Sequence, residues 1–127
     1  ARVRSAGDGG ERAEPVEEFL AGTAPRLVLD IEVEEPRWAG YASLRRPHAH
    51  HYTILAVSAA ETSAGLRVAV AGAGPSAVRL RSVEESGDPG DAVRDVTPAD
   101  DALASAAYRR RMLPVLVARA LASKGGP

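Results

Sequence analysis

Two apolar runs in the middle of the chain limit its possible folds more than any other feature. They are residues 52–62, YTILAVSAAET, and residues 65–74, GLRVAVAGAG. Both are rich in β-branched residues, and the short connection Ser-Ala-Gly between them ends in Gly65, which can adopt a positive φ. The two runs predict an antiparallel hairpin at the centre of a sheet.

Two segments before the hairpin also have the period of a strand. Residues 26–35, RLVLDIEVEE, alternate an apolar face with an increasingly acidic one and stop at Pro36. Residues 38–45, WAGYASLR, place Tyr41 on the face opposite to Gly40 and Ala42 and end before Pro47. We therefore expect a three- or four-stranded antiparallel sheet.

Helical patterns lie mainly in the last third of the chain. A short helix is predicted in EPVEEFL, ending at Gly22, and a second one is predicted to start at TPAD, where Thr97 caps the first turn. Residues 105–124 carry an apolar stripe that Pro114 should kink or restart. Ser86 to Gly90 reads as a surface loop. Strands first and helices last predict an α+β fold, with the antiparallel sheet packed against about three helices.

Composition limits the classes of function. The chain has 127 residues, no cysteine and a formal net charge of −1, which excludes disulfides and thiolate metal ligands and gives no electrostatic reason to bind nucleic acid. No apolar run reaches the roughly 20 residues that cross a bilayer, so we expect no membrane partner and a cytoplasmic location. The polar opening residues show no strong period, and the first residue is Ala1, which suggests a piece of a longer polypeptide.

All histidines of the chain lie in RRPHAHHYT, as His48, His50 and His51. In an extended segment only the first two point the same way, whereas zinc sites need three or four ligands, so we interpret them as exposed residues at a strand entrance. A metal site and a catalytic base remain the alternatives. GAGPSAVR, residues 72–79, is interpreted as a tight turn rather than an anion site, and YRRR, residues 108–111, as a solvated helix face. No catalytic or metal residue is assigned.

Three ordered segments carry a resemblance to a known family. WAGYASLRRPHAHHYTILAVSAA, LRVAVAGAGPSAVRLRSVE and TPADDALASAAYRRRMLPVLVARAL resemble the C-terminal domain of the FAD-binding (medium) subunit of molybdenum hydroxylases, the carbon monoxide dehydrogenase and xanthine dehydrogenase family. GERAEPVEEFLAG resembles the lead-in from the preceding domain of that subunit. The residues that carry the resemblance are Arg12, Phe19, Tyr41, Leu44, Arg46, Pro75, Arg79, Pro98, Asp101, Ser105, Tyr108 and Arg109.

The resemblance implies a division into a lead-in, residues 1–25, and a C-terminal α+β domain, residues 26–127. It implies that FAD is held mostly by upstream domains that this chain lacks, and that Tyr41 lies beside the flavin ring. The partners it implies are a molybdopterin-binding large subunit and an iron–sulfur small subunit, with electrons passing to an external acceptor. The chain alone would then be catalytically silent.

The chain departs from that family at two positions. Ser43 stands where the family has a lysine, and His50 where it has an aspartate, for which we expect a turn-stabilising role. These departures keep open a second interpretation, a non-enzymatic interaction or oligomerisation domain of the same fold without flavin contact. A small metal-binding protein built on the histidines is a third.

Overall fold

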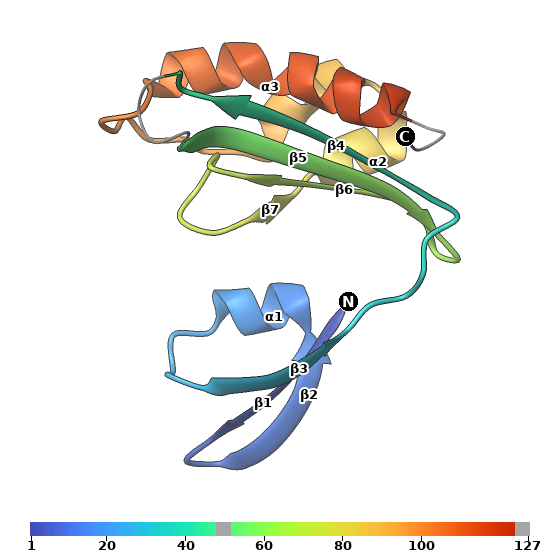
Figure 1. The fold of residues 1–127 in the computed structure, drawn as a ribbon, viewed down its shortest axis with the longest axis vertical. Helices are drawn as coiled ribbons and strands as arrows, with labels where there is room; N and C mark the ends of the chain where they lie inside the picture. The colour runs from blue at the N-terminus through green and yellow to red at the C-terminus, as the bar shows by residue number, and fades with distance from the viewer. Residues whose placement is uncertain (48–51, 124–127) are drawn as a thin grey trace. The chain divides into compact units, whose positions relative to one another are not determined.

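The computed structural model describes residues 1–47 and 52–123, and by its contacts the chain divides into two units (Figure 1). The first unit comprises residues 1–35 and the second residues 36–127. The boundary after residue 25 that the resemblance implies stays a prediction. By contacts the chain divides between Glu35 and Pro36, because strand β3 (Leu27–Glu32) pairs with the first strand of the chain.

The first unit is a three-stranded antiparallel sheet with one short helix. β1 (Arg2–Gly7) and β2 (Gly10–Pro15) form a hairpin, α1 (Val16–Ala21) follows, and the strand order is β2-β1-β3. The prediction of a short helix before Gly22 is confirmed. The first hairpin was not predicted, because RVRSAG and GERAEP have no apolar alternation and bury only Val3 and Ser5.

The strand predicted in residues 26–35 is present as β3, but the expectation about its sheet was wrong. It belongs to the sheet of the first unit, not to the sheet that contains the central hairpin. Although its residues alternate between apolar and acidic, all six residues of β3 are exposed.

The second unit contains the predicted hairpin at the centre of a four-stranded antiparallel sheet. The strands are β4 (Trp38–Arg45), β5 (Thr53–Thr62), β6 (Gly65–Ala71) and the short β7 (Val78–Arg79), in the order β4-β5-β6-β7. Gly65 has a φ of 92° and pairs with Thr62 at the hairpin turn, as the sequence predicted.

Helices cover one face of this sheet, which confirms the α+β prediction. They are α2 (Arg81–Ser86), the 3-10 helix η1 (Pro89–Arg94) and α3 (Ala106–Ala122), which lies along the sheet in Figure 1. The core between helices and sheet is aliphatic. Its largest fully buried side chains are Leu55, Val57, Val68, Val70, Leu80, Val83, Leu113, Leu116 and Val117.

The helix predicted to begin at Thr97 begins instead at Ala106, so that prediction was wrong. Residues 97–104 form a loop in which Asp101 Oδ1 accepts hydrogen bonds from the amides of Leu103 and Ala104. Aspartate side chains that bond nearby amides in this way compete with helix formation. Ser105 caps α3 by accepting from the amide of Tyr108 at 3.2 Å, and α3 continues through Pro114 as one helix.

The loop predicted between Ser86 and Gly90 is shorter than expected. α2 ends at Ser86, Gly87 adopts a left-handed φ of 74°, and η1 begins at Pro89. Asp88 caps η1 by accepting from the amide of Gly90 at 2.8 Å. The same turn-forming residues therefore end one helix and start the next.

α3 approaches β4 most closely at Gly40. A Cβ atom at this position would overlap the carbonyl oxygen of Ala120 and lie 3.1 Å from its carbonyl carbon. Gly40 and Ala42 are buried beneath the helix, and the residues between and beside them on β4 point the other way. This contact fixes which face of the sheet α3 covers.

Candidate functional site

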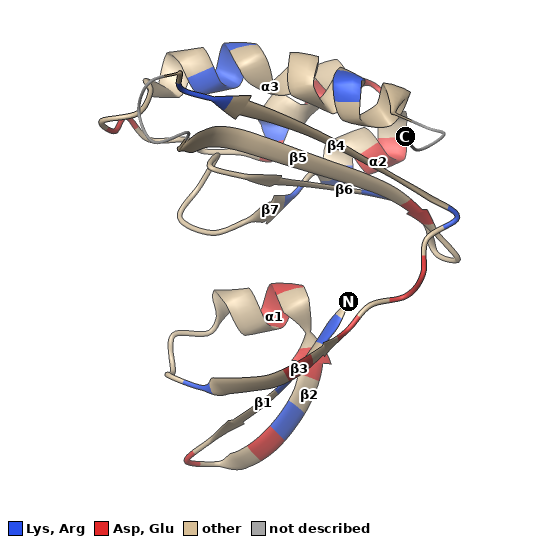
Figure 2. Cartoon of the chain, viewed as in Figure 1, with Lys and Arg blue, Asp and Glu red and all other residues tan. Residues whose placement is uncertain are grey.

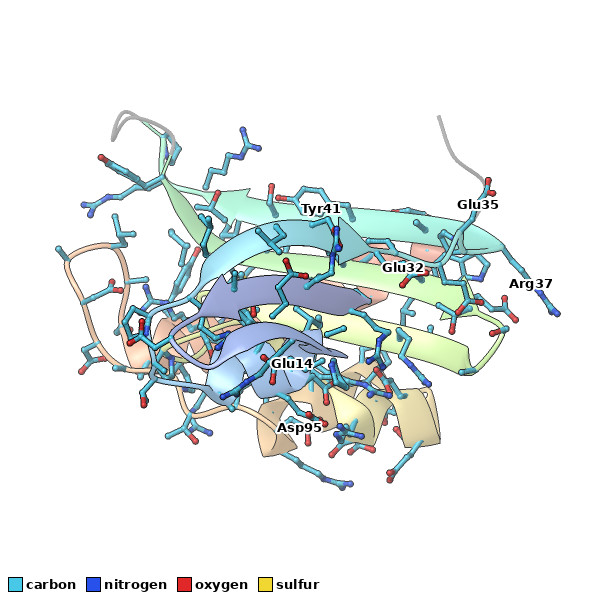
Figure 3. All side chains as sticks on the ribbon, turned by 90° about the horizontal axis from the view of Figure 1, so that it is seen from below. Glu14, Glu32, Glu35, Arg37, Tyr41 and Asp95 are labelled. Carbon is cyan, nitrogen blue, oxygen red and sulfur yellow. The ribbon has the colours of Figure 1, made fainter. Side chains whose placement is uncertain are left out.

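The face of the four-stranded sheet opposite to α3 is the candidate functional site, and we refer to it as the Tyr41 face. Tyr41 itself is 55% exposed, as its predicted position opposite to Gly40 and Ala42 requires. Figure 3 views the chain from this side and labels Tyr41 on β4. By strand alternation and register, the face consists of Ala39, Tyr41, Ser43, Ala56, Ser58, Ala60, Arg67, Ala69, Ala71 and Arg79.

One row of residues runs across the Tyr41 face from edge to edge. Tyr41 pairs with Ser58, Ser58 with Ala69, and Ala69 with Arg79. Three strand spacings of about 4.8 Å separate the two ends of the row by about 14 Å. The aromatic side chain of Tyr41 therefore lies at one edge of the face, and the arginine side chain of Arg79 lies at the other.

Between those ends, the floor of the Tyr41 face is low and nearly uncharged. β5 and β6 contribute small side chains there: Ala56, Ser58, Ala60, Ala69 and Ala71. Figure 2 shows the strands of this sheet without charged residues over most of their length. Because alanine and serine project little from a sheet, the floor leaves room for a flat group beside the Tyr41 ring.

The basic side of the Tyr41 face is neutralised at the sheet edge. The Glu84 side chain, only 8% exposed, accepts from Arg79 Nη2 at 2.6 Å and from the amide of Val68 at 2.9 Å, and lies 3.6 Å from Arg67 Nη1. Burial raises the pKa of Glu84, but the hydrogen bonds from Arg79 and Val68 and the charges of Arg79 and Arg67 outweigh it, so the pKa lies below its ordinary value. Both arginines are thus held by a carboxylate.

We expect Glu84→Gln to lower the free energy of unfolding at pH 7 by about 1–2 kcal/mol, because it removes charge-assisted hydrogen bonds. A carboxyl whose folded pKa is depressed stabilises the fold above its unfolded pKa of about 4.3 and loses that contribution as the pH falls through the folded pKa. The difference between wild type and variant should therefore shrink below about pH 4. Urea unfolding followed by Trp38 fluorescence at several pH values measures it.

Glu85→Gln is the matched control, since Glu85 is the exposed neighbour of Glu84 on α2. It should change the free energy of unfolding by less than about 0.5 kcal/mol at any pH. An equal effect of the two substitutions would contradict the role assigned to Glu84.

The histidine cluster lies outside the described residues, so the expectations for His48, His50 and His51 stay predictions. Within residues 1–47 and 52–123, no three carboxylate or imidazole side chains gather closely enough to hold a metal ion. None of the helices in this described part is long and apolar enough to cross a membrane.

Two features of the chain resemble anion-binding sites, and each has a structural role. At the start of α3, two amides have protein acceptors: Ala106 N–H donates to Asp100 Oδ1 at 2.5 Å, and Tyr108 N–H donates to Ser105 Oγ. The glycine-rich turn after β6 begins at Gly72, whose φ is 84° and where a Cβ would overlap the carbonyl oxygen of Ile54. Its positive φ and the close approach of the Ile54 backbone therefore explain why a glycine occupies position 72.

Arg109 is a structural residue that the sequence pattern misassigned. We expected the three arginines of YRRR to share a solvated face, but only Arg110 and Arg111 are exposed, whereas Arg109 is 4% exposed. Its guanidinium donates to the carbonyls of Ala99 and Ala104 and to Asp101 Oδ2, at 2.7, 3.0 and 2.7 Å. The hydrogen bond from Arg109 to Asp101 is the main cause that lowers the pKa of Asp101 to about 2. A paired aspartate eight residues upstream was the only sequence signal for this role.

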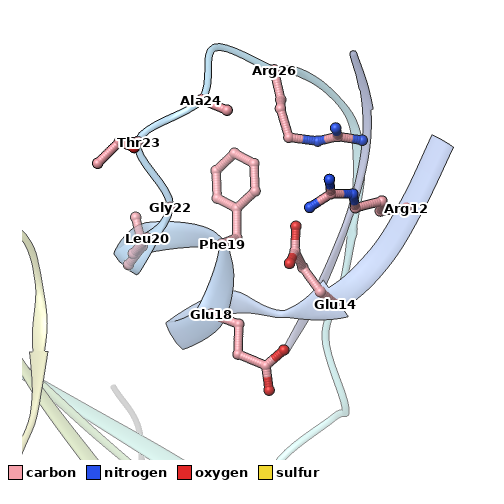
Figure 4. A pocket seen from close by; sticks show the side chains of 9 residues that line it. All are labelled: Arg12, Glu14, Glu18, Phe19, Leu20, Gly22, Thr23, Ala24 and Arg26. Carbon is pink, nitrogen blue, oxygen red and sulfur yellow. The ribbon is translucent and has the colours of Figure 1, made fainter. Parts of the chain in front are cut away.

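The first unit contains an open hollow of about 410 Å³ beside α1 (Figure 4). Phe19 stands in its middle, and the side chains of Arg12 and Glu14, both from β2, lie next to each other at one side of it. Arg26, also in its wall, is held by Ser5 Oγ at 2.8 Å and by the carbonyl of Gly10 at 2.8 Å. The hollow combines one aromatic ring with charges of both signs.

Comparison with known proteins adds sequence relatives and structural neighbours. No family model matches the chain. It is 30% identical over 109 residues to the uncharacterized protein YgfM of Escherichia coli strain K12, and the same match is found in strain O157:H7. The alignment covers 81% of this chain and 42% of YgfM, so the chain spans less than half the length of that relative.

Solved structures share the fold. A chain of quinoline 2-oxidoreductase from Pseudomonas putida 86 matches with a TM-score of 0.77 at 14% identity, over 97% of this chain and 51% of the other. Carbon monoxide dehydrogenase from Hydrogenophaga pseudoflava matches at 0.69 and 18%, over 97% and 52%, and the reconstituted enzyme from Oligotropha carboxidovorans at 0.69 and 17%, over 95% and 51%. The chain therefore has the fold of about half of a protein chain found in carbon monoxide dehydrogenase and in quinoline 2-oxidoreductase.

Proposed function

We propose that this chain is part of the FAD-binding subunit of a molybdopterin-dependent dehydrogenase, in which it forms one wall of the flavin site. The observation that carries the proposal is the Tyr41 face: an exposed tyrosine beside a floor of alanine and serine, in a fold shared with carbon monoxide dehydrogenase and quinoline 2-oxidoreductase. In the complete complex the flavin would accept electrons from a molybdopterin and iron–sulfur partner and pass them to an external acceptor.

The residues of this chain fit one part of FAD, its ring system. Tyr41 offers an aromatic surface and a hydroxyl that can reach a polar partner, and the small side chains next to it leave a ring plane unobstructed. The pyrophosphate of FAD needs N–H donors, and at the start of α3 the amides of Ala106 and Tyr108 already donate to Asp100 and Ser105. This supports the expectation that other segments of a longer subunit hold the phosphates.

When bound, the flavin supplies the redox chemistry, and the protein supplies position and polarity around it. Tyr41 would orient the ring plane, and the floor from Ser58 to Ala69 would exclude water from one side of it. Arg67 and Arg79 would contribute little charge to the ring, because Glu84 holds both. No catalytic residue is assigned to this chain.

We expect Tyr41→Leu to weaken flavin binding by about 2- to 10-fold in the complete, naturally encoded subunit with its partner subunits. The basis is that an aromatic contact contributes about 0.5–1.5 kcal/mol beyond area burial. The measurement is the FAD dissociation constant from the quenching of flavin fluorescence, together with the flavin absorption spectrum.

Tyr108→Leu is the matched control, because Tyr108 is a comparably exposed tyrosine (42%) that lies on α3 rather than on the Tyr41 face. It should leave FAD affinity and spectrum unchanged. Unchanged affinity in the Tyr41 variant as well would sink the assignment of Tyr41 to the ring.

The second candidate is an interaction or oligomerisation domain that keeps the fold without touching flavin. Ser43, which is on the Tyr41 face in the next row from Tyr41, favours it, because the resembling family has a lysine at this position. Purification of the complete subunit distinguishes the two. Stoichiometric FAD supports the first candidate, and a complex that assembles without flavin supports the second.

A further inference from the structure

The first unit buries too little surface to be a domain of its own. Of its 35 residues, only Val3 and Ser5 are buried, and α1 has no buried residue. Units below about 40 residues usually need disulfides, a metal or a partner to be stable, and this chain has no cysteine. Something outside these 35 residues must supply the missing contacts.

The apolar residues of and beside β3 show where those contacts are missing. β3 is an edge strand in the order β2-β1-β3, and among the described residues no strand pairs with its outer side. Five aliphatic side chains from this segment are 40–69% exposed: Leu27, Val28, Leu29, Ile31 and Val33. An edge strand with free backbone groups and exposed apolar side chains is a template for pairing with another strand.

Two of the exposed side chains extend the small buried patch of the unit. Ile31 pairs with Val3, and Val28 pairs with Ser5, so the two buried positions of the unit adjoin the free edge. The opposite face of the sheet carries charges, since Arg4 forms an ion pair with Asp30 and lies 3.9 Å from Glu11, and Leu27, which pairs with Ala6, lies on that charged face. The apolar patch therefore belongs to an interior that is incomplete at β3.

We propose that β3 is an internal strand of a larger sheet, and that an apolar strand from another segment of a longer polypeptide pairs with its free edge. YgfM and the neighbouring structures are about twice as long as the matched region. The structural matches cover 95–97% of this chain, so they include the first unit. The proposal is independent of whether the Tyr41 face binds flavin.

A second copy of this chain is the weaker choice of occupant. Pairing of two β3 edges would join two units that bury two residues each, and it would leave the hollow around Phe19 uncovered. A segment of a longer polypeptide can supply both a strand for the edge and side chains for the hollow.

The test compares amide hydrogen exchange of residues 26–35 in the 127-residue chain with that in the polypeptide encoded by the complete natural reading frame. We expect these amides to exchange at least about 100-fold more slowly in the complete polypeptide, because strand pairing protects amides that are free at an edge. FAD content is not part of the readout, so failure here and failure of the flavin proposal are separable.

A pair of substitutions sharpens the test. Ile31→Lys should be harmless in the 127-residue chain, where Ile31 is 58% exposed, and should lower the melting temperature of the complete polypeptide by several degrees. Asp8→Lys, in the exposed turn between β1 and β2, should be harmless in both.

Three results would overturn the proposal. The first is equal exchange of residues 26–35 in the two polypeptides, and the second is a natural reading frame no longer than this chain. The third is protection that appears in the 127-residue chain only as its concentration rises, together with a dimer by light scattering, which would make a second copy the occupant.

Discussion

Replacing Arg109 with methionine should lower the free energy of unfolding of the second unit by about 3 kcal/mol. The guanidinium is 4% exposed and donates to two loop carbonyls, Ala99 and Ala104, and to Asp101. Methionine keeps much of the volume but provides no donor, and each acceptor left without a partner costs about 1–3 kcal/mol where water cannot replace it. Trp38, the single tryptophan, packs against the core of this unit and reports its unfolding by fluorescence in urea.

Arg110→Met is the matched control, because Arg110 is the next residue and is exposed. It should change stability by less than about 0.5 kcal/mol. A result in which the two methionine variants are equally stable would show that the loop does not depend on Arg109. The loss of Arg109 should also return the pKa of Asp101 from about 2 toward its ordinary value, which carboxyl NMR titration can follow.

Gly40→Val should destabilise the second unit by about 3 kcal/mol or more. A Cβ at this position overlaps the carbonyl oxygen of Ala120 and meets Ser123 Cβ at 3.2 Å, so α3 must move away from β4 to make room. Overpacking of a close contact costs about 1–3 kcal/mol, and more when the obstacle is backbone that cannot change rotamer. Valine is otherwise favourable in a strand, which makes the predicted loss specific to the contact.

Ala39→Val controls for the strand, because Ala39 is adjacent on β4 and faces away from α3. It should alter the melting temperature by no more than a degree or two, since the added methyl groups project from the open face of the sheet. A Gly40 variant as stable as the Ala39 variant would mean that the helix is not seated against β4 at this point.

Patterns that depend on near neighbours predicted their elements well. The central hairpin, the strand Trp38–Arg45 and the outward orientation of Tyr41 all follow from a period of two and a turn glycine, and the structure confirms each of them. These features are local, because the side-chain period fixes the face as soon as the strand is recognised.

Features that depend on distant partners could not be predicted in the same way. Only one large apolar residue, Val3, occurs in β1 and β2, and the pairing of β1 with β3 joins residues more than 20 positions apart. Arg109 looks like its exposed neighbours until the loop from Ala99 to Ala104 folds over it. The last helix was predicted to start at Thr97 and starts at Ala106. Asp101 accepts from the amide of Leu103 and Asp100 from the amide of Ala106, and these side-chain hydrogen bonds replace helical ones.

The candidate site was predictable in position but not in composition. Alternation placed Tyr41 on the open face, but only the registers of β4, β5 and β6 bring Ser58 and Ala69 into line with it. The low floor beside the ring is therefore a property of strand pairing, and no short motif in the sequence encodes it.

At Gly40, only the backbone of β4 separates α3 from the Tyr41 face. On one side the backbone rests against the last turns of α3 near Ala120, and one residue further along, Tyr41 stands on the other side. No intervening layer of side chains cushions that step, because a glycine occupies it. A shift of α3 at Ala120 would therefore act directly on the β4 backbone that carries Tyr41.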